Sequence, residues 1–231
     1  MKRDKQTRQS RVNARSDQTP KPKKESTTLT KGKAAADRIL AAAFKSIARH
    51  GCGTVTLRGI ADEAGVALSQ LNYYYGNKDS LFTAVLKRMQ HDYVESLDKW
   101  LGDRDSLQEK IIALVEYHES ILERNPDLYR NFLEFFNFAM NSKPFQAEVA
   151  SFTAENAAMI ESHIVPYCAV SKSTHTYSQG EVVRYILSAS FGIALQHFLS
   201  PENVDVRKGF DIIKTTAVHI VGRVPVRRGK R

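Results

Sequence analysis

The chain has 231 residues, of which 42% are hydrophobic and 26% charged, as is typical of a globular protein with a sizeable core. Its formal net charge of +9 is concentrated at the ends, with +8 over residues 1–33 and +5 over residues 223–231, while residues 34–222 carry −4. Two cysteines make no disulfide framework, and the basic N-terminus lacks the apolar segment of a secretory signal. The longest apolar run, at 185–195, is shorter than a membrane span of roughly 20 residues and indicates a buried helix. We therefore expect a cytoplasmic protein.

The basic ends are predicted to be flexible. Residues 1–32 are rich in Lys, Arg, Gln, Ser and Thr and contain no aromatic residue, so burial cannot offset the entropy lost on ordering. We therefore predict a disordered basic arm at 1–32 and a basic tail at 223–231. Such ends suit an acidic polymer such as DNA, and solubilising tails without a partner are the alternative.

Three helices are predicted between residues 33 and 75. The stretch KAAADRILAAAFKSIARHG carries apolar residues at helical spacing and ends at Gly51. Thr56 is a suitable N-cap for a short second helix that ends at Gly65, and LSQLNYYY forms a third helix that stops at Gly76. This order and spacing are those of a helix-turn-helix motif.

The rest of the chain continues the helical pattern. A long amphipathic helix is predicted from Lys78, followed by helices that begin near Leu107, Pro126 and Pro144, and two long helices at 179–199 and about 206–221. No alternating pattern of apolar and polar residues argues for strands. The sequence therefore predicts an all-α protein of about nine helices.

The segments RILAAAFKSIARHG, TLRGIADEAGV and LNYYYGNKDSLF resemble the N-terminal DNA-binding domain of the TetR family of transcriptional repressors. The resemblance covers about residues 33–82, with the helix-turn-helix at about 56–75. It implies that residues 83–222 form an effector-binding and dimerisation domain, in which the last two long helices pair with those of a second subunit. Packing within one chain is the alternative for those helices.

Several positions depart from the family pattern. Ala67 replaces a capping hydroxyl, which costs ~1 kcal/mol of helix stability if nothing compensates. Ser69 replaces a glycine and Tyr75 a phenylalanine. Asn72 replaces a tyrosine that commonly contacts a phosphate, although its amide can still donate one hydrogen bond.

Helical direction divides the three consecutive tyrosines. Leu71 and Tyr75 lie four residues apart and share a face, so Tyr75 is predicted to pack against the preceding helices. Tyr73 and Tyr74 then point away from the core. By resemblance Tyr74 contacts a DNA phosphate, while Tyr73 can meet a base edge or a thymine methyl group.

Gln70 is the best candidate for reading a base, because a glutamine can pair with both N6 and N7 of adenine; contact with water alone is the alternative. Lys78 resembles the family's backbone-positioning lysine. Thr56 lies where a helix N-terminus can meet a phosphate, and Arg58 either reaches the groove or only solvates the surface. The full predicted DNA-binding set is Thr56, Arg58, Leu68, Ser69, Gln70, Asn72, Tyr73, Tyr74 and Lys78.

Aromatic residues are dense between residues 93 and 167, which favours an apolar cavity for a small effector, with plain core as the alternative. The predicted contacts to this unknown effector are Tyr93, Trp100, Tyr117, His118, Phe132, Glu134, Phe136, Asn137 and His163. By resemblance, binding shifts the helix that begins at Lys78. No two histidines stand three or four residues apart, so we expect no metal site, and we expect no cofactor.

No motif indicates an enzyme: the chain has no Gly-rich phosphate loop after a strand, no HExxH and no GxSxG. We expect a sequence-specific DNA-binding transcriptional regulator, a repressor that a small molecule releases from a palindromic operator. The alternative with the same fold is an architectural or cell-division protein that binds many DNA sites with little sequence choice.

Overall fold

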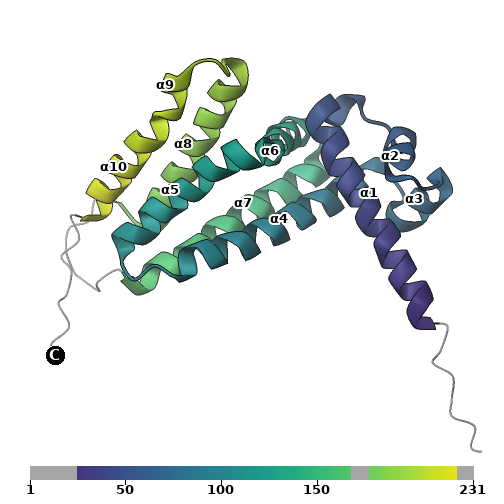
Figure 1. The fold of residues 1–231 in the computed structure, drawn as a ribbon, viewed down its shortest axis with the longest axis horizontal. Helices are drawn as coiled ribbons and strands as arrows, with labels where there is room; N and C mark the ends of the chain where they lie inside the picture. Colours follow the sequence, from purple (N-terminus) through teal and green to yellow (C-terminus); the bar gives the residue numbers. More distant parts are fainter. Residues whose placement is uncertain (1–24, 168–176, 223–231) are drawn as a thin grey trace, which may run out of the picture.

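The computed structural model describes residues 25–167 and 177–222, and these form ten α-helices and one 3₁₀ turn with no strand among them (Figure 1). This confirms the predicted all-α class. The helices are α1 (Glu25–Thr54), α2 (Leu57–Ala64), α3 (Leu68–Tyr75), α4 (Lys78–Gly102), α5 (Leu107–Arg124), α6 (Pro126–Ala139), α7 (Lys143–Ile164), α8 (Gln179–Leu199), α9 (Val204–Arg207) and α10 (Gly209–Gly222), and the turn is η1 (Val165–Tyr167). The predicted arm as far as residue 24, Cys168 and the tail at 223–231 lie outside the described residues.

The first helix is longer than the sequence predicts. α1 begins at Glu25, so residues 25–32, which composition assigns to a disordered arm, are helical. Composition is a poor guide here because extending an existing helix fixes only one more residue per added hydrogen bond, whereas starting one is costly. At the other end Gly51 has φ 77° and ψ 157°, a backbone conformation that interrupts α1 where the sequence predicts its end.

Local residues explain the ends of the next three helices. Thr56 accepts a hydrogen bond from the N–H of Gly59 at 3.1 Å and so caps α2, and Gly65 ends that helix in the left-handed conformation with φ 64°. Ala67 precedes α3 without any side-chain cap, as its methyl group requires. Asn77 caps α4 by accepting from the N–H of Ser80 at 2.8 Å.

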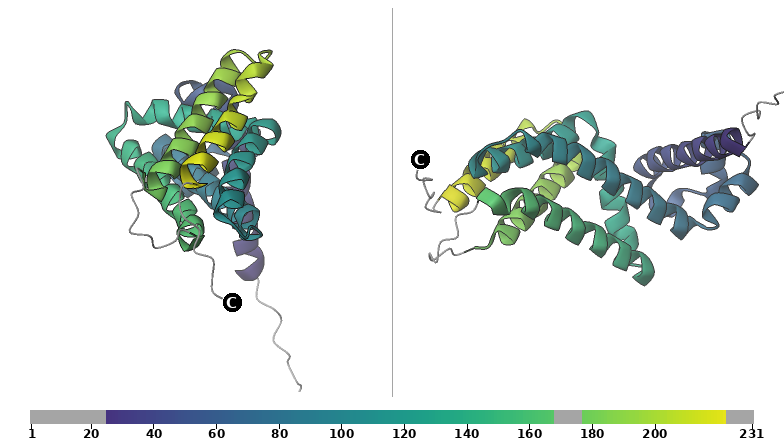
Figure 2. Two further views of the ribbon diagram at one scale, coloured as in Figure 1. Left: turned by 90° about the vertical axis from the view of Figure 1, so that its left-hand side faces the viewer. Right: turned by 90° about the horizontal axis from the view of Figure 1, so that it is seen from below.

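The molecule is elongated, with α1, α2 and α3 at one end and α8, α9 and α10 at the other (Figures 1 and 2). Between these ends α4 packs beside α7, α5 packs on α10, and α6 packs on α1. The rings of three buried phenylalanines join α4, α6 and α7. The centroids of Phe82, Phe135 and Phe145 lie within 6.4 Å of one another. The end of the molecule that carries α2 and α3 is therefore connected to the body through both α4 and α6.

The last two predicted helices differ from the structure in two ways. The helix expected at about 206–221 is divided into α9 and α10, which meet beside Gly209; a Cβ atom there would lie 2.8 Å from the side chain of Ile193, so the chain approaches α8 closely at this point. α8, predicted to be buried, is buried on one face only. It is the one described helix long and apolar enough to cross a membrane by length and composition, a test that helices of soluble proteins also pass, and only 28% of its apolar window is buried.

Candidate nucleic-acid interface and ligand chamber

One face of α3 is held against α1. Leu71 is completely buried, and the half-buried Tyr75 donates a hydrogen bond from its hydroxyl to the carbonyl oxygen of Ala36 at 3.2 Å. These contacts agree with the packing role predicted for Tyr75. They fix the direction in which the opposite face of α3 points.

The side chains of Tyr73 and Tyr74 differ in exposure. Tyr73 is 83% exposed, as predicted, and its ring meets that of Tyr74 edge to face with the centroids 5.3 Å apart. Tyr74 is half-buried against the core, so the prediction that it points away is wrong. Its hydroxyl approaches α1 so closely that a Cβ atom at Gly32 would lie 3.2 Å away, because a turn of 100° per residue carries Tyr74 round toward α1.

The exposed side of α3 carries Ser69, Asn72 and Tyr73, with the half-buried Gln70 beside them. The helix has no acidic residue, so nothing on it repels phosphates. Leu68, the first residue of α3, is partly buried against the core, and its contact with DNA stays a prediction.

Thr56, Arg58 and Lys78 flank α3 in the predicted interface. Arg58 and Thr56 are exposed at the start of α2, although the Thr56 hydroxyl already accepts the capping hydrogen bond. Lys78 is half-buried at the start of α4, with its ammonium group 5.5 Å from the centroid of the Phe82 ring. This packing restrains Lys78 and suits a positioning contact.

A cavity of about 380 Å³, here called the chamber, lies within the body between α4, α5, α6, α7 and α8. Its volume falls in the range of small-molecule sites. It is lined by Tyr93, His118, Ile121, Leu128, Tyr129, Phe132, Phe136, Phe152, Thr153, Ala154, Asn156, Ala157, Arg184, Leu187, Ser188 and Phe191. Tyr93, His118, Phe132 and Phe136 are thus brought together as predicted.

The other predicted ligand contacts do not line the chamber. Trp100 packs on Tyr117, with ring centroids 5.8 Å apart. Tyr117 lines an adjoining groove of about 760 Å³ between α1, α4 and α5, which shares Tyr93, Ile121 and Leu128 with the chamber. His163 lies 2.9 Å from Asp98, and Asn137 is exposed. Apolar spacing alone does not distinguish a cavity wall from ordinary core or surface.

Glu134 faces α1 instead of the chamber. Two positions along a helix rotate a side chain by 200°, so Glu134 lies opposite Phe132 on α6. Its carboxylate accepts a hydrogen bond from the main-chain N–H of Cys52 at 2.8 Å, beside the interruption at Gly51. One turn earlier, the buried Asn131 donates from its amide to the carbonyl oxygen of Phe44 at 3.0 Å. α6 therefore has one face in the chamber and another on α1.

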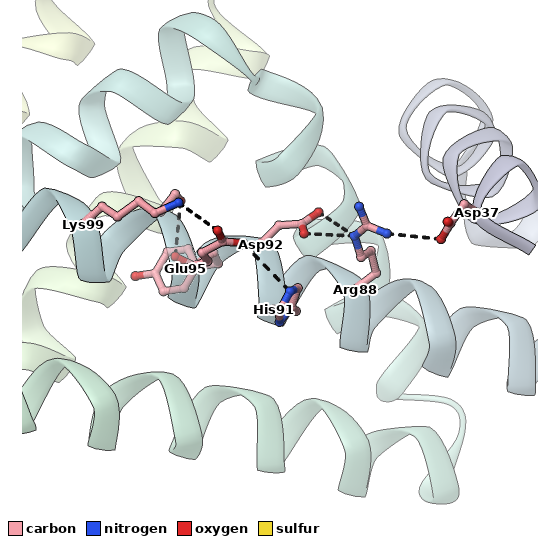
Figure 3. A network of polar contacts seen from close by, with 8 residues as sticks. Asp37, Arg88, His91, Asp92, Glu95 and Lys99 are labelled. Carbon is pink, nitrogen blue, oxygen red and sulfur yellow. Dashed lines mark hydrogen bonds and ion pairs between the residues drawn. The ribbon is translucent and has the colours of Figure 1, made fainter. Parts of the chain in front are cut away.

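A weaker connection joins α1 to α4. Figure 3 shows Arg88 of α4 directed toward Asp37 of α1 and Asp92 of its own helix, at 3.5 and 2.9 Å, with a further exposed pair between Glu95 and Lys99 along α4. About half of the Arg88 side chain is exposed, and such surface pairs contribute only ~0–1 kcal/mol each. The partly buried hydrogen bonds between α6 and α1 are therefore a firmer attachment of α1 to the body than this surface ion pair.

His118 is completely buried in the chamber wall. Its Nε2 atom lies 3.1 Å from the hydroxyl of Tyr93, and its Nδ1 atom lies 2.9 Å from the hydroxyl of Tyr129. Burial lowers the pKa of His118 to about 4, so the imidazole is neutral at pH 7. The same burial raises the pKa of both tyrosines, and the three groups form a neutral polar network.

The predicted ligand contacts do not include the polar residues that α7 and α8 bring to the chamber. Thr153 and Asn156 lie one turn apart on α7, and Arg184 and Ser188 lie one turn apart on α8. The sequence does carry a signal for one of them, because Asn156 interrupts the otherwise apolar buried stripe of α7. Within the described ranges no group of three or more His, Cys, Asp or Glu side chains is placed to hold a metal ion.

Residues 39–85 match the family model described as bacterial regulatory proteins, tetR family. This part of the chain is therefore similar to the tetR family of bacterial regulatory proteins. Over 105 residues the chain is 27% identical to the HTH-type transcriptional regulator BetI of Brucella anthropi, covering 46% of this chain and 54% of that protein. Over 124 residues it is 32% identical to the HTH-type transcriptional repressor SCO4008 of Streptomyces coelicolor, covering 53% and 61%. The matches thus span little more than half the length of these relatives.

Solved structures are similar to this chain in fold beyond residues 39–85. The transcriptional regulator FadR from Bacillus subtilis, solved with stearoyl-CoA, superposes with a TM-score of 0.68 at 15% identity, covering 78% of this chain and 96% of that one. FadR from Bacillus halodurans gives 0.67 at 16% identity, covering 79% and 93%. At these identities the likeness establishes the shared fold.

Proposed function

We propose that the protein is a dimeric, sequence-specific DNA-binding transcriptional regulator. This proposal rests on the placement of α3. Leu71 and Tyr75 anchor one face of the helix, so that Gln70 and Tyr73 lie on or beside its solvent-facing side, which has no acidic residue. That arrangement suits insertion into a major groove. The names of the relatives, which are transcriptional regulators, support this role over an enzymatic one and favour the cytoplasm.

The domain division of the proposal follows the helices. Residues 33–82 form the DNA-binding part and residues 83–222 the effector and dimerisation part. In the second part α8, α9 and α10 expose large apolar side chains, including Leu195 at 45%, Leu199 at 75% and Ile212 at 65%. Pairing with the same helices of a second subunit would cover them and would place two copies of α3 on a two-fold symmetric site.

We propose that a small organic effector occupies the chamber and that α6 transmits its binding, in addition to the shift of α4 implied by the family resemblance. Phe132 and Phe136 reach the chamber, while Asn131 and Glu134 hold α1. An effector that prefers one position of α6 therefore changes the placement of α1 and the two α3 helices. A differential affinity of about 1–3 kcal/mol is the usual range for such coupling.

Release from DNA on effector binding is the proposed direction. Support comes from SCO4008, which is named a repressor, and from the stearoyl-CoA held by a protein of the same fold.

Selection of genomic DNA fragments by the full-length protein tests the proposal. We expect recovery of one or a few palindromic sites whose binding is weakened when α3 is altered. A broad spread of unrelated fragments would instead support the architectural or cell-division alternative.

A further inference from the structure

The chamber walls are aromatic around Phe191. The ring of Phe191 meets those of Tyr129, Phe132 and Phe136 edge to face, at centroid distances of 5.5, 5.4 and 5.7 Å and angles of 87–90°. Rings packed in this way hold their orientation and present flat apolar surfaces. The walls therefore favour a flat, apolar ligand body that can stack on or meet the edges of the rings.

The α7 wall contains a buried acceptor without a partner. Asn156 is only 5% exposed, and its Oδ1 atom has no hydrogen-bond partner among the described residues. A buried carbonyl left unpaired destabilises a protein, so such groups normally mark a missing partner. One turn earlier, Thr153 donates its hydroxyl hydrogen to the carbonyl oxygen of Ala150 at 2.9 Å, which leaves the Thr153 oxygen as a second acceptor. This wall therefore fits a ligand group that donates a hydrogen bond.

The polar groups around His118, by contrast, need no hydrogen-bond partner from a ligand. Tyr93 and Tyr129 satisfy the two ring nitrogens of His118, and the Tyr129 hydroxyl also reaches the carbonyl oxygen of His118 at 3.4 Å. These three residues can thus be satisfied without a ligand. Recognition of polar ligand groups falls to α7 and α8.

Arg184 is the only ionised side chain among the chamber-lining residues, since His118 is neutral. Its side chain is 66% exposed, and a carboxylate oxygen of Glu161 lies 4.0 Å from the guanidinium group, at the outer limit of an ion pair. The guanidinium group therefore remains largely available to an anion at the edge of the chamber. A cationic ligand would meet repulsion there and would find no lining carboxylate.

We infer that the chamber binds an aromatic acid that also carries a neutral hydrogen-bond donor. The aromatic body lies against Phe191 and its neighbours, the donor meets Asn156, and the acidic group meets Arg184. This inference rests on the proposed function, because it names the ligand class of the same chamber.

Matched small-molecule trios test the ligand class on the full-length protein. One trio is indole-3-acetate, 1-methylindole-3-acetate and tryptamine; the other is 3-(4-hydroxyphenyl)propanoate, its 4-methoxy analogue and tyramine. Within each trio the second compound lacks the donor of the ring system and the third replaces the acid by an amine. Ligand-observed NMR detects weak binding, and calorimetry gives the affinities.

We expect each acid with a donor to bind about tenfold more tightly than its methylated analogue, and each amine to bind more weakly still. Asn156→Leu should remove the preference for the donor, and Arg184→Gln should remove the preference for acids over amines. Asn137→Leu, which alters an exposed asparagine of α6 outside the chamber, should change neither.

The comparison within each trio uses the unaltered protein, so poor folding of a variant does not weaken it. Equal binding of the methylated acids, equal or tighter binding of the amines, or no binding by either trio would overturn the inference. A separate outcome concerns the proposed function. If the acids bind as expected but leave the affinity for selected DNA fragments unchanged, the ligand class stands and effector control of DNA binding fails.

Discussion

Buried His118 should make the protein lose stability in mild acid. In the unfolded chain its imidazole has a pKa near 6.5, and burial lowers that value to about 4 in the folded protein. The folded state therefore binds fewer protons than the unfolded state between these values, and stability falls as the pH drops from 6.5 toward 4. A shift of this size corresponds to about 3 kcal/mol once the pH is below both values, and to roughly 2–3 kcal/mol at pH 4.5.

Urea unfolding of the unaltered protein and of His118→Gln, at several pH values from 7 to 4.5, measures this effect. Glutamine stays neutral throughout, and its amide can donate and accept between Tyr93 and Tyr129, whereas exposed carboxylates titrate alike in both proteins. The unaltered protein should lose roughly 2–3 kcal/mol more than the variant between pH 7 and 4.5. Parallel stability curves for the two proteins would refute the assignment of a buried neutral imidazole.

Five further substitutions test the DNA interface, the contact of α6 with α1, and the dimer. Gln70→Ala should cost about 1–3 kcal/mol of DNA affinity and relax preference at one base position, while Lys78→Ala should weaken all sequences alike; equal losses across sequences in both would exclude Gln70 as a reader. Glu134→Ala, which leaves the N–H of Cys52 unpaired, should lower the free energy of unfolding by about 1–3 kcal/mol in denaturant titrations, with a smaller loss for Glu134→Gln; no loss in either would show that the bond is not stabilising. Ile212→Glu should convert dimers to monomers in sedimentation velocity, and an unchanged oligomeric state would remove α10 from the proposed interface.

Local features of the fold could be predicted from the sequence because the chemistry that produces them is local. The Thr56 cap, the left-handed Gly65 and the bounds of α8 each depend on residues within a few positions of one another. Helical period likewise separated the packed Tyr75 from the exposed Tyr73. The all-α class follows from the same patterns repeated along the chain.

Only the tertiary structure decided which residues meet across helices. Glu134 and Cys52 are 82 positions apart, and no local pattern indicates that the carboxylate of one accepts the N–H of the other. The prediction for Tyr74 is wrong for a related reason, because the surroundings of its side chain depend on where α1 lies beside α3. Asn156 and Arg184 meet at one chamber only because α7 and α8 pack together. Periodicity identifies the face of a helix that is buried, whereas the partner of that face is set by the packing of the whole chain.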